Sequence, residues 1–130
     1  MNNRKMGNSF EQELCEILSN YGFWAHNLKQ DNSGQPADVI AVRNKVPYLI
    51  DAKVCSNNKF PLSRIEENQH LAMDMWEMCG NGVGWFALKL ENQIYMLSYY
   101  ILDNTRSLTL SADDICSVGI PIEKWVTKCK

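Results

Sequence analysis

The sequence lacks the features that define several common classes of protein. No apolar run is long enough to span a membrane and no segment has a signal-peptide pattern, so we predict a soluble, cytoplasmic protein with no membrane partner. The five cysteines include no Cys-x-x-Cys pair, which favours reduced thiols over a zinc site or a disulfide framework. The chain also has no P-loop, no glycine-rich dinucleotide turn and no Ser-His-Asp or Cys-His set. The sequence therefore contains none of these common motifs for nucleotide binding or nucleophilic catalysis.

An excess of basic charge is also missing. The 130 residues include 13 basic and 15 acidic side chains, a net charge of −2, which by itself argues against a nucleic-acid partner. The distribution is uneven, because residues 1–64 hold eight basic and six acidic groups whereas residues 65–130 hold five and nine. Metal ions bound to acidic groups of the first half would leave that half positive. The candidate phosphate-binding side chains, each of which could instead be an ordinary solubilising charge, are Arg4, Lys5, Lys29, Arg43, Lys45, Lys59 and Arg64.

The apolar pattern predicts one α/β domain over residues 1–130. We expect a core over about 5–100 and a C-terminal extension over 101–130, without repeats or linkers. The order α-β-β-β-α-β-β predicts a mixed sheet flanked by helices. The predicted helices are 9–21 and 63–79, followed later by a short one at 111–116, and the predicted strands are 23–28, 37–42, 46–54, 83–90, 93–100 and 120–125.

Start and stop signals bound the two long helices. Gly22 and Gly80 are the predicted stops, since glycine adopts the left-handed conformation that commonly ends a helix. Ser63-Arg64-Ile65-Glu66 matches a capping box and predicts that the second helix starts at Ser63.

Two acidic residues lie on the predicted strands 37–42 and 46–54. If these strands form a hairpin with a two-residue turn at Asn44-Lys45, paired positions sum to 89, and Asp38 lies directly across from Asp51. Opposed residues of antiparallel strands have Cβ atoms about 5 Å apart and share a face. Lys53 points to that face as well, because side chains alternate along a strand. Lys45 departs from the glycine that a type I′ turn prefers.

This arrangement predicts a metal site. Carboxylates so close repel each other unless protons or a metal lie between them, and oxygen ligands suit Mg²⁺, with Mn²⁺ as a substitute. Both faces of the hairpin are apolar, so a charge there is costly unless paired or metal-bound. A structural Asp–Lys pair is the alternative. We predict Asp38, Asp51 and the Ala52 carbonyl as ligands, with Lys53 orienting an attacking water or stabilising the developing oxyanion during phosphodiester hydrolysis.

Three further residues have two interpretations each. Glu11 is either an ordinary acidic residue at a helix start or part of the site. Gln69 shares a helix face with apolar residues, and it could orient a metal-bound water, touch a phosphate or make a structural hydrogen bond to nearby backbone. Trp24 could stack on a base, but core packing is favoured.

Together these residues resemble the PD-(D/E)XK nuclease superfamily. The resemblance covers a glutamate on the first helix, Ala37-Asp38, Asp51-Ala52-Lys53 and the α-β-β-β-α-β order. Residues 5–14 and 37–41 look like archaeal Holliday-junction resolvases of the Hjc type, whereas residues 60–69, 82–86 and 120–124 resemble the bacterial RecU type. Two departures stand out: the segment 27–38 is too short for the RecU stalk that threads the junction, and position 51 carries Asp where these resolvases usually have Glu.

The resemblance implies a restriction-endonuclease-like αβββαβ core and a set of roles. Glu11, Asp38 and Asp51 would bind the metals, Lys53 would be catalytic and Gln69 would support the site. It also implies a homodimer that nicks two strands of a four-way DNA junction and leaves 5′-phosphates.

We therefore predict a metal-dependent, structure-selective DNA endonuclease, specifically a Holliday-junction resolvase. One alternative is a restriction-like or repair endonuclease that acts on duplex DNA. The others are a non-catalytic DNA-binding member of the same fold and a ribonuclease on the same scaffold.

Overall fold

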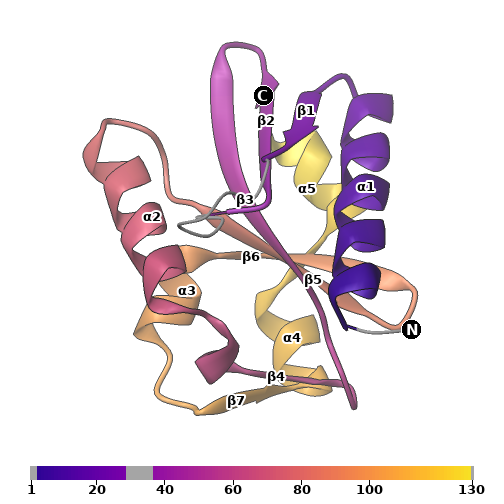
Figure 1. The fold of residues 1–130 in the computed structure, drawn as a ribbon, viewed down its shortest axis with the longest axis vertical. Coiled ribbons are helices and arrows are strands. Elements are labelled where there is room, and N and C mark those ends of the chain that lie inside the picture. The colour runs from indigo at the N-terminus through magenta and orange to yellow at the C-terminus, as the bar shows by residue number, and fades with distance from the viewer. Residues whose placement is uncertain (1–2, 29–36, 130) are drawn as a thin grey trace.

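The computed structural model describes residues 3–28 and 37–129, with residues 3–8 described as backbone only (Figure 1). The bounds of its helices and strands follow in chain order. They are α1 (Asn3–Asn20), β1 (Trp24–Asn27), β2 (Val39–Arg43), β3 (Val46–Val54), β4 (Lys59–Pro61), the 3₁₀ turn η1 (Leu62–Arg64), α2 (Glu67–Met78), β5 (Trp85–Leu90), β6 (Gln93–Ser98), α3 (Tyr99–Asn104), β7 (Thr109–Ser111), α4 (Ala112–Val118), β8 (Ile120–Pro121) and α5 (Ile122–Lys128).

A mixed sheet forms the centre of the molecule. Its strand order is β1-β2-β3-β5-β6-β8, and β3 and β5 are parallel while the other neighbours are antiparallel. The crossover between β3 and β5 contains α2, as a parallel connection requires. Strands β4 and β7 form a separate two-stranded sheet. The predicted fold class, a mixed sheet flanked by helices, is confirmed.

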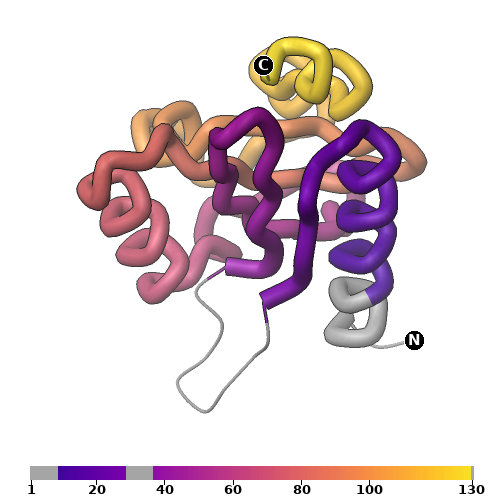
Figure 2. Tube along the Cα trace, turned by 90° about the horizontal axis from the view of Figure 1, so that it is seen from above, coloured from indigo at the N-terminus to yellow at the C-terminus, as the bar shows by residue number. Residues whose placement is uncertain are grey.

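The helices divide the core into two layers. On one face, Phe10, Leu14 and Leu18 of α1 pack with residues of α5 against alternate residues of β2 and β3. On the other face, Met73 of α2 is fully buried and packs closely on Gly84, where a Cβ would require the Met73 side chain to move. Figure 2 shows α1 and α2 on opposite sides of the β2–β3 hairpin.

The β2–β3 hairpin has the predicted register. Val39 pairs with Ile50 and Arg43 pairs with Val46, so paired positions sum to 89. The turn residues Asn44 and Lys45 both have positive φ, 54° and 70°, as a two-residue type I′ turn requires. A lysine thus occupies the position where glycine is preferred, and the register is kept because the flanking residues pair along the strands.

Several predicted boundaries were wrong. Helix α2 begins at Glu67 rather than 63, because its capping box uses Glu66 and Gln69 and not Ser63. The strand predicted at 120–125 has only two residues and leads into α5, whose Trp125 is buried against the sheet. Periodicity alone does not distinguish a short apolar strand from one turn of a buried helix.

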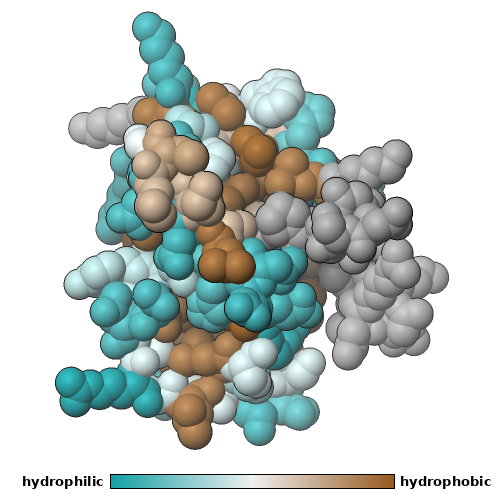
Figure 3. All heavy atoms as spheres, turned by 60° about the vertical axis from the view of Figure 1, so that its left-hand side comes forward, coloured by the Kyte–Doolittle hydropathy of each residue, from teal (hydrophilic) through white to brown (hydrophobic). Residues whose placement is uncertain are grey.

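The surface on the α2 side is mixed. Figure 3 shows hydrophobic atoms gathered in the upper half and near the lower edge of this side, with a band of hydrophilic side chains between them. The exposed apolar residues of α2 are Leu71, Met75 and Met78. Trp24, which we expected in the core, is 60% exposed.

Among the helices of residues 3–28 and 37–129, none has both the length and the apolarity needed to cross a bilayer.

Candidate active site

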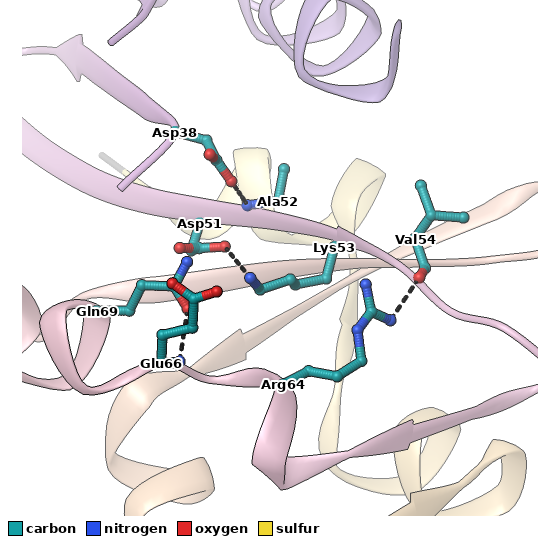
Figure 4. A network of polar contacts seen from close by, with 8 residues as sticks. All are labelled: Asp38, Asp51, Ala52, Lys53, Val54, Arg64, Glu66 and Gln69. Atoms are coloured by element: carbon teal, nitrogen blue, oxygen red, sulfur yellow. Dashed lines mark hydrogen bonds and ion pairs between the residues drawn. The ribbon is translucent and has the colours of Figure 1, made fainter. Parts of the chain in front are cut away.

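Asp38 and Asp51 meet where β2 and β3 pair. Asp51 is fully buried, and Asp38 precedes β2 by one residue and interacts electrostatically with Asp51. The Ala52 N–H donates to Asp38 Oδ2 at 2.6 Å, which fixes one carboxyl to the strand that carries the other. Lys53 Nζ lies 3.5 Å from Asp51 Oδ1, an ion-pair distance (Figure 4). The predicted trio of two acids and one amine is therefore assembled.

Burial makes the charged state of this pair costly. It raises the pKa of the Asp51 carboxyl well above its ordinary value, and the negative charge of Asp38 raises it further against the opposing effect of Lys53. Burial also raises the pKa of Asp38, although the hydrogen bond from Ala52 favours its charged form. One ammonium compensates the buried Asp51 carboxylate and the half-buried Asp38 carboxylate only in part, so the site needs either a proton or a further cation.

The donor set fits a hard divalent cation. Both carboxylate oxygens of Asp51 are buried, and the polar groups that act on them among the described residues are the Lys53 ammonium, 3.5 Å from Oδ1, and the Asp38 carboxyl. A buried carboxylate whose charge is compensated only in part is costly, and Mg²⁺ or Mn²⁺ bound to its oxygens would lower that cost. The arrangement can therefore hold a metal ion next to an ammonium, the combination that hydrolyses phosphate esters. A role for the Ala52 carbonyl as a ligand stays a prediction.

Comparison with known proteins agrees with this chemistry. The sequence model described as archaeal Holliday junction resolvase (Hjc) matches residues 1–130. The chain belongs to this family. The solved structure of Hjc from the archaeal hyperthermophile Archaeoglobus fulgidus matches with a TM-score of 0.73 at 19% identity, covering 92% of this chain and 99% of that one. At this identity the structural likeness concerns the fold, and no curated protein matches the sequence.

Family membership makes the chain a Holliday-junction resolvase, an endonuclease that acts on four-way DNA junctions. The expectation of a nuclease of this type, drawn from the acids, the lysine and the order of elements, is confirmed.

The predicted third carboxylate, Glu11, lies on α1. Helix α1 packs on the face of β2 and β3 that carries Val39 and Ile50, whereas Asp51 points toward α2. Across residues 3–28 and 37–129, no three His, Cys, Asp or Glu side chains converge as a metal-binding group. A ligand set of Glu11, Asp38 and Asp51 stays a prediction.

Gln69 lies at the start of α2, beside the resolvase site. It is 7% exposed, and its Oε1 accepts a hydrogen bond from the Glu66 N–H at 3.0 Å, while Glu66 accepts one from the Gln69 N–H. This is the structural hydrogen bond that was one of its two interpretations. Figure 4 shows Asp51 pointing toward this end of α2, so Gln69 anchors the helix start that lines the site. A direct role in orienting water stays a prediction.

Glu66 is a carboxylate near the site that sequence reasoning did not select. Its position as N-cap of α2 places it on the same side of β3 as Asp51 (Figure 4). The signal was the spacing Glu66-x-x-Gln69, which is a capping-box pattern with Glu in the place of Ser or Thr.

The predicted DNA-binding residues fall into three groups. Arg43 has a structural role, because its guanidinium donates to the carbonyls of Tyr21, Val126 and Cys129 and lies 4.3 Å from the Phe23 ring centroid. Its prediction as a phosphate ligand is corrected for that reason.

The second group lies on the α2 side and is accessible. Lys59 is exposed at the start of β4, and Arg64 ends η1 with Nη1 donating to the Val54 carbonyl at 2.7 Å (Figure 4). The third group is Arg4, Lys5 and Lys29. The side chains of Arg4 and Lys5 and the whole of Lys29 lie outside the described residues.

Proposed function

We propose that this resolvase cuts four-way DNA junctions by metal-assisted hydrolysis at Asp38, Asp51 and Lys53, with Mg²⁺ as the ion, Mn²⁺ as its substitute and 5′-phosphates as the product ends. One observation carries the proposal. The fully buried Asp51 carboxylate lies next to a second carboxylate, Asp38, and 3.5 Å from the single ammonium of Lys53, so the charge of the pair is compensated only in part. Such a cluster is costly for a protein that only binds DNA.

Each residue of the cluster has a separate task. Asp38 and Asp51 would hold the ion, and the burial of Asp51 would limit competition from bulk water. Mg²⁺ held there would lower the pKa of a water and neutralise charge on the scissile phosphate. Lys53, held 3.5 Å from Asp51, is placed to donate to a phosphate oxygen or to orient the attacking water.

Lys59 and Arg64 would bind the DNA backbone next to the scissile phosphate. Arg64 uses Nη1 for the Val54 carbonyl, and a guanidinium has five N–H donors, so it can also donate to a phosphate. Its position on the α2 side puts that contact on the same face of β3 as Lys53 (Figure 4).

A substrate comparison tests the proposal. The protein is incubated with Mg²⁺ and either a four-way junction or a linear duplex of the same sequence, and we expect cuts near the branch point of the junction only. Asp51→Asn is expected to abolish cutting while junction binding persists or tightens, because a negative charge near the phosphates is removed. Equal cutting of both DNAs would favour the duplex endonuclease, cutting of RNA alone a ribonuclease, and binding without cutting a non-catalytic protein.

We also propose that the resolvase works as a homodimer, because resolution of a junction needs two cuts and the described residues provide one carboxylate pair. The exposed residues Leu71, Met75 and Met78 recur at a spacing of four and three along α2 and thus share one face of the helix. Light scattering should give a dimer mass for the wild type. Met75→Glu should shift it toward monomer, whereas Leu108→Glu, at an even more exposed apolar position, should not.

A further inference from the structure

The strand at one edge of the sheet carries an exposed aromatic pair. Trp24 is 60% exposed on β1, and its ring centroid lies 4.2 Å from that of His26, with the planes tilted by 46°. Residues two apart on a strand point to the same side, so the pair forms one surface. Neither Trp24 nor His26 belongs to either core cluster, so the exposed faces of the two rings are available for a ligand.

The pair lies on the catalytic face of the sheet. Trp24 pairs with Val42 and His26 pairs with Ile40, so along β2 these positions alternate with Val39 and Ala41, which face α1. Ile40 packs instead in the cluster on the α2 side. Asp38 is two residues from Ile40 and thus shares this face, as its contact with Asp51 requires.

The register also sets how far the pair is from the metal site. Along an antiparallel strand each residue advances about 3.4 Å, so His26 lies about 7 Å and Trp24 about 14 Å from the level of Asp38. Stacked bases of one DNA strand are about 3.4 Å apart along the helix axis. A strand whose phosphate sits at the carboxylates would therefore bring a base a few nucleotides away to the rings.

We propose that Trp24, supported by His26, stacks on a nucleobase left exposed at the branch point of a four-way junction. Inside a linear duplex both faces of each base are covered by its neighbours, whereas an opened branch point leaves base faces that an aromatic side chain can cover. The contact would therefore favour a junction over a duplex without reading sequence. This inference rests on the proposed function, since it assumes that a junction is held at Asp38 and Asp51.

The test places 2-aminopurine, a fluorescent adenine analogue, at the branch point of a four-way junction or ten base pairs into one arm. Asp51→Asn protein is used so that the DNA stays intact. Stacking on Trp24 should quench the branch-point probe and leave the arm probe unchanged. In the Asp51→Asn background, Trp24→Ala should remove the quenching, Trp24→Phe should keep most of it, and Tyr100→Ala, at a residue 67% exposed on α3, should leave it unaltered.

Binding is the second readout, measured in the Asp51→Asn background so that the DNA stays intact. We expect Trp24→Ala to weaken junction binding by about 5- to 100-fold and to leave duplex binding unchanged, with a smaller loss for His26→Ala. Cleavage is measured with proteins that have an intact Asp51. The inference would be overturned if Trp24→Ala left quenching and junction affinity unchanged, or if it weakened junction and duplex binding equally. In either case, junction cutting by the wild type would still support the proposed function. Failure of the wild type to cut any junction would instead defeat the proposed function itself.

Discussion

The two faces of the strands β2 and β3 differ in polarity, although their residues alternate along the same strands. On the α1 face, Val39, Ala41 and Ile50 are completely buried among apolar side chains. On the α2 face, Asp38 and Asp51 alternate with them, and burial and mutual repulsion make the charged form of Asp51 unfavourable. Adjacent residues of one strand therefore belong to the apolar core and to the proposed catalytic site, and substitutions at adjacent positions should separate stability from activity.

The largest effect is expected on the catalytic face. Lys53→Gln removes the ammonium that compensates the pair and stabilises charge on the phosphate, so we expect a loss of about 10²- to 10³-fold in single-turnover junction cleavage. Circular dichroism should show an unchanged fold. Cleavage within a few-fold of the wild type would mean that Lys53 is only a structural partner of Asp51.

Ile50→Ala is the matched change on the α1 face. Removing a fully buried isoleucine next to Asp51 should lower the free energy of unfolding by about 2–5 kcal/mol, measured by urea denaturation. The fraction that remains folded should cut junctions at nearly the wild-type rate. If cleavage falls as far as it does for Lys53→Gln while the protein stays folded, the two faces are not separable.

The raised pKa values of Asp38 and Asp51 predict how stability depends on pH without metal. The folded state binds these protons more tightly than the unfolded state, so the contribution of this pair to stability should be greatest below the ordinary carboxyl pKa and should be lost as pH rises through the folded values. Asp51→Asn should flatten this dependence and raise the unfolding free energy at pH 8 by about 1–3 kcal/mol.

Mg²⁺ supplies the complementary measurement. It should raise the melting temperature of the wild type at pH 8, where the carboxylates are ionised, more than at pH 5, and leave Asp51→Asn unaffected. Equal stabilisation of the two proteins would contradict the assignment of Asp51 as a ligand.

The smallest effects should separate two arginines. Arg64→Gln should reduce the slope of log affinity against log salt by about one, as loss of a phosphate contact does, and should cost less stability than Arg43→Gln because it removes one hydrogen bond to a backbone carbonyl rather than three. Arg43→Gln should leave this slope unchanged and cost about 1–3 kcal/mol of stability, because the carbonyls of Tyr21, Val126 and Cys129 lose their donor. The opposite pattern would reverse the roles assigned to them.

Much of the site could be predicted because it is local. Asp38, Asp51 and Lys53 lie on one hairpin with a two-residue turn, and alternation along two neighbouring strands determines which side chains share a face. The helix boundary at Ser63 was missed because two overlapping capping patterns, from Ser63 and from Glu66, cannot be ranked without knowing how α2 packs.

The residues that were misassigned depend on segments far apart in the chain. Arg43 could be assigned to the fold only once α5, more than 80 residues later, was placed over β2. The exposure of Trp24 follows from the position of β1 at the edge of the sheet.

By itself, the sequence determined which acids and which amine of this resolvase meet, and on which face of a strand, because hydrogen-bonded neighbours of a hairpin are set by turn length and side-chain alternation. The tertiary structure alone decided which charged and aromatic side chains remain available to DNA. That choice depends on how helices distant in the chain cover each face of the sheet, and no local pattern encodes it.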